Sequence, residues 1–274
     1  MKQSVYFDAI DNRMIFAIPR NNTTYIGTTD TKYSLDKNNI KILKSEVKYL
    51  LESVNNYFSI ILTLKDVVSS WSGLRPLIKE EGKKVTEISR KDEIFVSDNG
   101  IITIAGGKLT GYRKMAERVV NVVIKAKNHQ SFNECITSNI KLYESENLNQ
   151  IKKQIFSYLL KNQHSKDQVV SLYDMYGENL KEIIKISKTL KSFSKVNAII
   201  ISEFIYCFEN EMCQKLLDFF SQRTGRVYFE IEKVSDQVQI IKETYKKLKG
   251  ISEKEFDLER VELKNYINSI TTFI

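Results

Sequence analysis

The chain has 274 residues, and its 42 lysines and arginines against 34 aspartates and glutamates give a formal net charge of +8. Hydrophobic residues make up 42% and charged residues 28%, which excludes a disordered tail, a collagen-like repeat and a disulfide scaffold. At ~100–200 residues per domain we expect two domains, 1–128 and 140–274. No apolar run approaches the ~18–20 residues of a membrane span, and residues 1–16 lack a signal-peptide core, so a cytoplasmic protein is expected.

The first 110 residues are expected to form mainly strands and turns. β-branched and aromatic residues on both sides of an Asn-Asn pair predict a hairpin over 13–27. Apolar residues then recur at helical spacing over 47–58, whereas 67–71 returns to an extended pattern. The segments 93–96 and 101–105 are expected to pair as strands through an Asp-Asn-Gly turn.

A pair of glycines, Gly106 and Gly107, follows the last of these strands, and a helix is predicted from Thr110 to Ala126. The N-terminus of a helix presents unpaired N–H groups and partial positive charge, so it binds anions or electron-rich ring edges. Glycines at such a point let a ligand approach the backbone closely. This junction of strand, glycine pair and helix is the most informative local feature of the sequence.

The glycine pair does not belong to a common nucleotide-binding loop. A Walker loop needs GxxxxGK[ST], but Ile102 occupies the position of its first glycine and Leu109 follows Lys108. The sequence contains no GxGxxG, so the usual pyrophosphate site of a dinucleotide-binding domain is absent. If the protein uses a dinucleotide, another segment must bind most of it.

The excess positive charge is concentrated in the first half of the chain. Residues 1–140 hold 21 basic and 15 acidic side chains, a net +6, whereas 141–274 hold 21 and 19, a net +2. This excess is too diffuse for a nucleic-acid-binding surface but suits a cleft for a small anion. No nucleic-acid partner is therefore expected.

Three basic residues near strand ends are candidates for binding that anion. Arg75 lies between a glycine two residues earlier and a proline immediately after it, and a guanidinium can hold phosphate or carboxylate in a bidentate fork. Arg90 and Lys108 are the other two candidates. On the residues alone, a turn ion pair for Arg75 and solvated charges for the other two remain the alternatives.

Histidines and cysteines offer no catalytic group. His129 and His164, the two histidines, lie in polar surroundings and are expected to be exposed, so the sequence shows no convincing general base. Cys135, Cys207 and Cys213 are expected to be buried reduced thiols, because none forms a CxxC pair. No spacing of metal ligands stands out.

The second half of the chain is expected to be an all-α domain, joined to the first around 128–145. Residues 145–274 show long stretches of helical periodicity and contain no proline. The run Val196–Phe220 predicts one mostly buried helix, and Arg223-Thr224-Gly225 is a plausible end for it.

Five short segments carry a resemblance to a known family. They are RMIFAIPR at 13–20, YIGTTDT at 25–31, SGLRPL at 72–77, ISR at 88–90 and GGKLTGYRKMAE at 106–117. In order and spacing they resemble the FAD-dependent (aerobic) glycerol-3-phosphate dehydrogenases, and the helical second half resembles the family's C-terminal domain. The resemblance implies an α+β fold: the mixed sheet of a substrate-binding and FAD-domain remainder, followed by an all-α C-terminal helical domain.

The resemblance also implies roles for individual residues. Arg75 and Arg90 match the arginines that bind the substrate, and Arg75 and Lys108 match catalytic positions. A fixed cation at Lys108 would stabilise the alkoxide character that develops on the substrate oxygen as hydride leaves. Four residues of the glycine junction are implied to contact the flavin: Gly107, Lys108, Leu109 and Thr110.

Family members are about twice this long and begin with a Gly-rich FAD-binding segment, which is absent here. We therefore expect FAD and the catalytic base to lie mainly with that segment, and the isolated chain to be inactive. The implied substrate is glycerol 3-phosphate, oxidised to dihydroxyacetone phosphate, with quinone as the electron acceptor. A peripheral membrane contact and a homo-oligomer are compatible with this reading. The alternatives are a glycerophosphate oxidase that uses oxygen, and a non-catalytic module that binds a phosphorylated metabolite or a protein.

Overall fold

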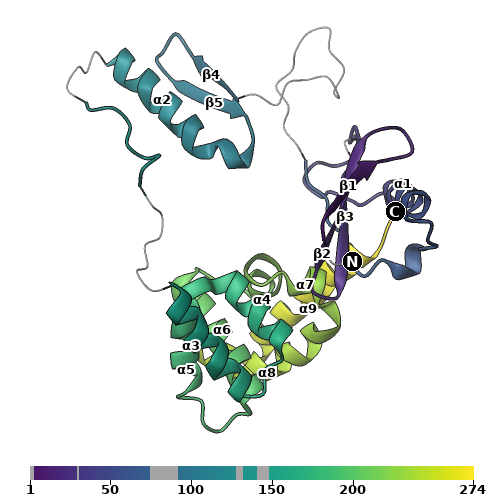
Figure 1. The fold of residues 1–274 in the computed structure, drawn as a ribbon, viewed down its shortest axis with the longest axis vertical. Helices are drawn as coiled ribbons and strands as arrows, with labels where there is room; N and C mark the ends of the chain where they lie inside the picture. The colour runs from purple at the N-terminus through teal and green to yellow at the C-terminus, as the bar shows by residue number, and fades with distance from the viewer. Residues whose placement is uncertain (1–2, 30, 75–91, 128–131, 141–147) are drawn as a thin grey trace. The chain divides into compact units, whose positions relative to one another are not determined.

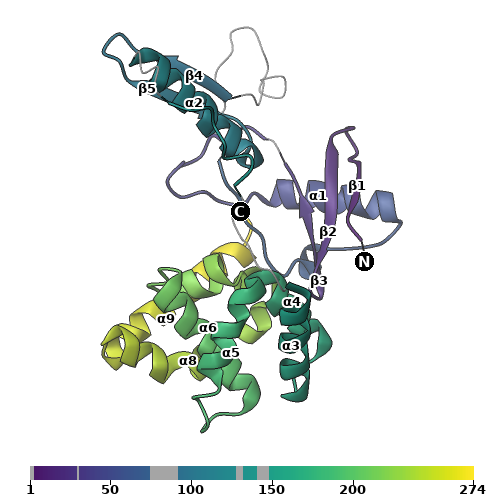
Figure 2. The same ribbon diagram turned by 60° about the vertical axis from the view of Figure 1, so that its left-hand side comes forward.

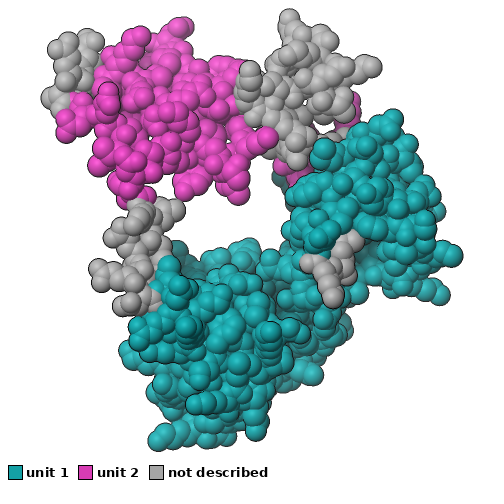
Figure 3. All heavy atoms as spheres, in the orientation of Figure 1, with its two compact units in different colours: residues 1–29, 38–72, 147–274 teal, residues 30–37, 73–146 magenta. Residues whose placement is uncertain are grey.

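The computed structural model describes residues 3–29, 31–74, 92–127, 132–140 and 148–274. The chain divides into two compact units, shown in different colours in Figure 3. Unit 1 comprises residues 1–29, 38–72 and 147–274, and unit 2 comprises 30–37 and 73–146. Each unit combines segments that are far apart in the sequence. The expected division into domains 1–128 and 140–274 stays a prediction.

Unit 1 begins with an antiparallel sheet in the order β1-β2-β3, formed by β1 (Val5–Asp8), β2 (Met14–Arg20) and β3 (Thr23–Gly27). Side chains alternate along β2: Ile15 is fully buried, whereas its neighbour Met14 is 71% exposed. The hairpin expected over 13–27 is thus confirmed as β2 and β3.

Helix α1 (Lys44–Phe58) lies beside this sheet, as Figures 1 and 2 show, and buries apolar side chains against it. Val54 of α1 belongs to the same buried cluster as Phe7 and Ile15 of the sheet. The helix ends at Ser59, which adopts left-handed backbone angles, and the segment expected to be helical over 47–58 lies within it.

The rest of unit 1 is helical. Its helices are α3 (Leu148–Lys161), α4 (Lys166–Tyr176), α5 (Leu180–Ser187), α6 (Lys195–Asn210), α7 (Arg226–Phe229), α8 (Ile231–Lys249) and α9 (Glu253–Thr271). Helix α6 lies in the middle of their core, where Ile201 and Phe204 are fully buried. None of the helices in the described ranges is long and apolar enough to cross a membrane.

The single helix expected over Val196–Phe220 is wrong. Helix α6 stops at Asn210, and a separate π-helical turn, Asp218–Arg223, follows. The chain reverses at Met212, which has a φ of 53°, and the N–H of Cys213 then donates to the carbonyl of Cys207 at 3.2 Å. The break keeps the apolar residues on both sides of it in the core.

The segment 67–71, expected to be extended, pairs with no strand and contacts the helical part of unit 1 instead. The Ser69 hydroxyl donates to the carbonyl of Tyr228 at 2.7 Å. The ring of Trp71 packs edge-on against Tyr228 and Phe229, with centroids 5.1 and 5.9 Å apart. Partners distant in the sequence therefore decide the conformation of this segment.

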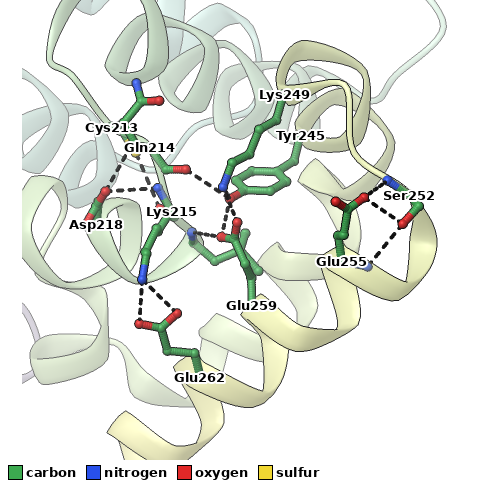
Figure 4. Close-up of polar contacts among 11 residues, drawn as sticks. Cys213, Gln214, Lys215, Asp218, Tyr245, Lys249, Ser252, Glu255, Glu259 and Glu262 are labelled. Carbon is green, nitrogen blue, oxygen red and sulfur yellow. Dashed lines mark hydrogen bonds and ion pairs between the residues drawn. The ribbon is translucent and has the colours of Figure 1, made fainter.

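A polar network fastens the last helix, α9, to the rest of unit 1, as Figure 4 shows. The carboxylate of Glu259 accepts hydrogen bonds from Tyr245 and Lys249 of α8. Lys215, in the segment before the π-helical turn, pairs with Glu262 of α9 at 2.9 Å. Desolvation by burial and the hydrogen bond to Glu259 raise the pKa of Tyr245. This network holds helices together and leaves no acid or base free for chemistry.

Unit 2 consists of a hairpin and one helix in its described part. Strands β4 (Asp92–Val96) and β5 (Ile102–Gly106) pair antiparallel, and α2 (Tyr112–Ala126) follows after a short 3₁₀ turn. The expected strands and helix are confirmed. In contrast to unit 1, no described side chain of unit 2 is fully buried.

Candidate functional site

The junction between β5 and α2 has a backbone conformation that strongly favours glycine. Gly106 and Gly107 have φ values of 75° and 82°, in the region that residues with a Cβ atom rarely occupy. A Cβ atom on Gly107 would lie 2.7 Å from the sulfur of Met115 and 3.2 Å from the Cβ of Asp92. The strand therefore turns into the helix with its backbone packed directly on the side chains of both neighbours.

The helix start beyond the glycines presents free donors. Lys108 is extended and precedes a 3₁₀ turn, Leu109–Gly111, that leads into α2. The first backbone N–H bonded within this turn is that of Gly111, which donates to the carbonyl of Lys108 at 2.8 Å. The N–H groups of Leu109 and Thr110 precede it, and the side chain of Leu109 is 90% exposed. These donors can bind an anion or an electron-rich ring edge.

The charges in the first two turns of α2 are paired, but that of Lys108 is not. Arg118 forms an ion pair with Asp92 of β4. Hydrogen bonds from Lys114 and Arg113 to Glu117 lower the pKa of that carboxyl. Lys108 forms no ion pair with another residue in the described part of the chain. It is therefore the cation of this junction that can serve a ligand.

The structure brings together part of the expected site. Gly107, Lys108, Leu109 and Thr110 form the continuous turn at the start of α2. Arg75 and Arg90 lie outside the described residues, so their expected contacts with the substrate stay predictions. The junction supplies one cation and a set of backbone donors, which suits binding and charge stabilisation but not proton abstraction.

The expectation that His164 is exposed is wrong, because its side chain is buried, with 6% of its surface accessible. Ser165 caps α4 and forms a capping box with Gln168, so His164 occupies the position just before the cap. A residue there packs against the first turns of the helix, and Val169 in that turn is also buried. Burial lowers the pKa of His164. His129 lies outside the described residues.

The expectation that all cysteines are buried holds for two of them. Cys207 and Cys213 are buried free thiols, and burial raises the pKa of both, that of Cys213 to about 12. Cys135 is exposed, because it lies in unit 2, where no described side chain is fully buried. In the described ranges, no group of His, Cys, Asp and Glu side chains could hold a metal ion.

Reasoning from the sequence missed a buried ion pair between Glu203 of α6 and Arg226 of α7. Tyr176 also donates to Glu203, at 2.8 Å. Although burial by itself would lower the pKa of Arg226, the charge of Glu203 raises it. A single acid within the apolar run of α6 was the available signal, because a buried carboxylate requires a partner.

Comparisons with known proteins cover both parts of the chain. Residues 2–113 match the family model described as FAD dependent oxidoreductase. Residues 135–256 match the model described as the C-terminal domain of alpha-glycerophosphate oxidase. The first match includes the glycine junction, and the second includes most of the helices of unit 1.

Several glycerol-3-phosphate dehydrogenases are similar to the chain. The aerobic enzyme of Bacillus subtilis (strain 168) is 42% identical over 243 residues, covering 84% of this chain and 44% of the relative. That of Staphylococcus saprophyticus is 35% identical, covering 98% and 50%. The structure of the glycerol-3-phosphate dehydrogenase from Bacillus halodurans complexed with FAD matches with a TM-score of 0.81 and 34% identity, covering 99% of this chain and 54% of that one. The chain spans about half the length of the curated relatives it matches.

Proposed function

We propose that this chain, which is similar to FAD-dependent glycerol-3-phosphate dehydrogenases over nearly its whole length, supplies part of the substrate and flavin site of such an enzyme. The reaction would be the oxidation of sn-glycerol 3-phosphate to dihydroxyacetone phosphate. When bound, FAD supplies the acceptor, flavin N5, for the hydride that leaves C2 of the substrate. The observation that carries the proposal is the glycine junction with its unpaired cation, Lys108.

The residues of the junction fit an electron-rich ring edge. Gly107 lets the backbone turn tightly onto α2, and the N–H groups of Leu109 and Thr110 precede the first bonded N–H of the turn. These donors would hold the polar edge of the isoalloxazine. Lys108 would lie beside the substrate oxygen and stabilise the negative charge that forms there when the hydroxyl proton passes to the catalytic base. That charge is then consumed in the new carbonyl bond as the hydride leaves C2.

The proposal also covers phosphate binding, the catalytic base and the electron acceptor. Arg75 and Arg90 would bind the phosphate of the substrate, since guanidinium groups form bidentate hydrogen bonds with phosphate oxygens. The catalytic base and most of the flavin contacts would lie outside this chain. Electrons would pass to quinone, in a protein at the cytoplasmic side with peripheral membrane contact, and self-association is compatible with this. By itself, the chain is expected to be inactive.

The role of Lys108 can be tested in a fusion of this chain to the N-terminal half of the Bacillus subtilis relative. Glycerol 3-phosphate oxidation is followed with an artificial electron acceptor. Lys108→Met should lower kcat about 100-fold or more, because a preorganised charge at the developing anion is lost. Lys114→Met is the matched control, since Lys114 lies in the first turn of the adjoining helix α2 and pairs with Glu117. Equal activities of the two variants would refute the assignment of Lys108.

The expectation that the isolated chain is inactive has its own test. The purified chain is titrated with FAD while the flavin absorbance is recorded, and the mixture is then assayed with glycerol 3-phosphate. Weak or no binding and no turnover are expected. Stoichiometric, tight FAD binding with turnover would show that the chain contains a complete site.

A glycerophosphate oxidase is the second candidate, and the match of residues 135–256 to the C-terminal domain of alpha-glycerophosphate oxidase favours it. The two enzymes differ in the electron acceptor. The peroxide formed for each substrate molecule oxidised by the fusion protein distinguishes them: a yield near one indicates an oxidase, and a yield near zero a dehydrogenase.

A non-catalytic binding module is the remaining alternative. It predicts that glycerol 3-phosphate raises the melting temperature of the chain without FAD, and that Arg75→Ala abolishes this shift. The same measurement on the wild-type chain with FAD added should then show no further change.

A further inference from the structure

A pocket lies among the helices of unit 1. Residues of α4, α6, α7 and α8 line it, and Arg20 at the end of β2 adds to its wall. Its volume is about 90 Å³. A single water needs about 10–15 Å³ of such space, so the pocket can hold several waters or one small molecule. Spaces between packed helices are common positions for small-molecule sites.

Three buried polar atoms with no hydrogen-bond partner in the described structure belong to residues of this pocket. They are Nε2 of His164, Nη1 of Arg226 and Oε1 of Gln237. His164 and Gln237 are 6% and 7% exposed, so bulk water does not supply the missing bonds. An unpaired buried polar atom costs about 1–3 kcal/mol. Three of them on one cavity indicate that a bound molecule provides their partners.

The hydrogen-bonding character of the three atoms defines what that molecule must offer. Burial lowers the pKa of His164 and so favours its neutral ring, whereas the backbone of Lys195 acts on the same ring in the opposite direction. With its proton on Nδ1, the neutral ring presents a lone pair at Nε2. Oε1 of Gln237 is also an acceptor, whereas Nη1 of Arg226 is a donor. A ligand must donate twice and accept once, as hydroxyl groups can.

The charges change from the inside of the pocket to its mouth. Inside, Arg226 and Glu203 form an ion pair and neutralise each other. At the exposed side, Lys233 pairs with Glu230 at 2.9 Å. The guanidinium of Arg20, also exposed, lies 4.8 Å from the centre of the Phe229 ring and has no ion pair with another described residue. An anionic group at the mouth would therefore find a cation free to bind it.

We propose that this pocket binds a small hydroxylated anion, a sugar acid or a phosphorylated polyol. Its hydroxyl groups bond with His164, Gln237 and Arg226 inside, and its carboxylate or phosphate lies against Arg20 at the mouth. The proposed oxidation of glycerol 3-phosphate assigns no ligand to this pocket, so the inference goes beyond that function. Its test needs no turnover, and the two proposals can fail separately.

The test uses the imidazole nitrogens of the complete chain, observed by long-range proton–nitrogen NMR. The chain has 2 histidines, so the signals of His164 and His129 are easily separated. Glycerate, glycerol 3-phosphate, glycerol and inorganic phosphate are added at matched concentrations. We expect glycerate or glycerol 3-phosphate to shift the Nε2 signal of His164, and the stronger of the two identifies the anionic group. Glycerol and phosphate, which each lack one half of the ligand, should bind at least about tenfold more weakly.

Two variants test the two ends of the ligand. Arg20→Ala should weaken binding about tenfold, whereas Arg260→Ala, at an exposed arginine that pairs with Asp257, should leave it unchanged. Gln237→Met removes an acceptor at similar volume and should also weaken binding about tenfold, with the fluorescence of Trp71 verifying the fold. The proposal is overturned if neither anion moves the His164 signal, if glycerol binds as tightly as the anions, or if Arg20→Ala binds normally.

Discussion

Helices and strands of the two units follow the same local sequence patterns. The units differ in how much of their apolar side chains they bury. In unit 1 the helices enclose an apolar core in which Phe204 and Phe219 are fully buried. In unit 2 the apolar side chains of the hairpin and helix remain accessible; Phe95 and Val96 of β4 are 46% and 57% exposed. Hydrophobic burial contributes about 25 cal/mol per Å², so most of the stability must come from unit 1.

The difference shows that local sequence pattern is enough to form the helices and strands, whereas stability depends on how much apolar surface they bury. Strands β4 and β5 and helix α2 follow from their alternation, turn and helical periodicity. Surface ion pairs such as Arg118 with Asp92 contribute little to the stability of unit 2. We therefore expect unit 2 to open before unit 1. The following predictions test that comparison.

The largest effect is expected from Phe204→Ala, which removes a ring at the centre of the core of unit 1. Phe204 packs against Phe219 and Tyr245, with ring centroids 5.5 and 5.3 Å away. The free energy of unfolding should fall by about 4 kcal/mol, measured by urea denaturation with Trp71 fluorescence. Val120→Ala, on the exposed face of α2, should change it by less than about 0.5 kcal/mol. Similar losses in both variants would contradict the comparison.

The next effect concerns the buried ion pair of unit 1. Glu203→Gln leaves the charge of Arg226 buried with Glu230, whose carboxylate lies 3.7 Å away, as its remaining partner. The free energy of unfolding should fall by about 3 kcal/mol. Glu262→Gln breaks the exposed pair with Lys215 and should cost less than about 1 kcal/mol. If both variants lose the same amount in urea denaturation, burial does not determine the strength of the pair.

A smaller effect is expected at the glycines of unit 2. Gly107→Ala combines a φ of 82° with a Cβ atom 2.7 Å from the sulfur of Met115, and should destabilise the junction by about 2 kcal/mol. Gly100→Ala has a similar φ of 83° but open space around its Cβ, so about 1 kcal/mol is expected. Amide hydrogen exchange in β5 and α2 measures both losses. Faster exchange across α6 in Gly107→Ala would show that the units are not independent.

The smallest effect is a pH dependence at the surface of unit 1. Hydrogen bonds from Lys242 and Lys246 lower the pKa of Glu253 from 4.5 to about 2. Because the pKa is lower in the folded state, the stabilisation is complete above about pH 4.5 and is lost as the pH falls towards 2. An NMR titration of the carboxyl carbon should show Lys242→Ala moving this pKa towards 4.5, with Lys247→Ala as the control. An unchanged value in Lys242→Ala would contradict the assignment.

Elements formed by local pattern were predictable, and those formed by distant partners were not. The hairpin, α1, β4, β5 and α2 each follow from periodicity and turn residues within their own segments. The end of α6 depends on the chain reversal at Met212, and no proline or glycine marks it. The conformation of 67–71 depends on Tyr228 and Phe229, which lie more than a hundred residues further along the chain.

The functional sites also differ in whether local sequence or distant residues determine them. The glycine junction could be predicted, because a glycine pair between a strand and a helix has a local meaning that the φ values of Gly106 and Gly107 confirm. The pocket of unit 1 could not, because His164, in the turn before α4, and Gln237 of α8 meet only in the folded chain. Polar residues in a polar segment carry no signal of burial until their neighbours in space are known.

Cys135 and Trp71 together give the wild-type chain two positions for an optical measurement. The thiol of Cys135 is exposed, and a hydrogen bond with Thr137 lowers its pKa, whereas the other two thiols are buried. A thiol-reactive acceptor dye would therefore attach to unit 2, while the single tryptophan, Trp71, is a natural donor in unit 1. Resonance energy transfer between them can follow the separation of the two units in solution without any substitution.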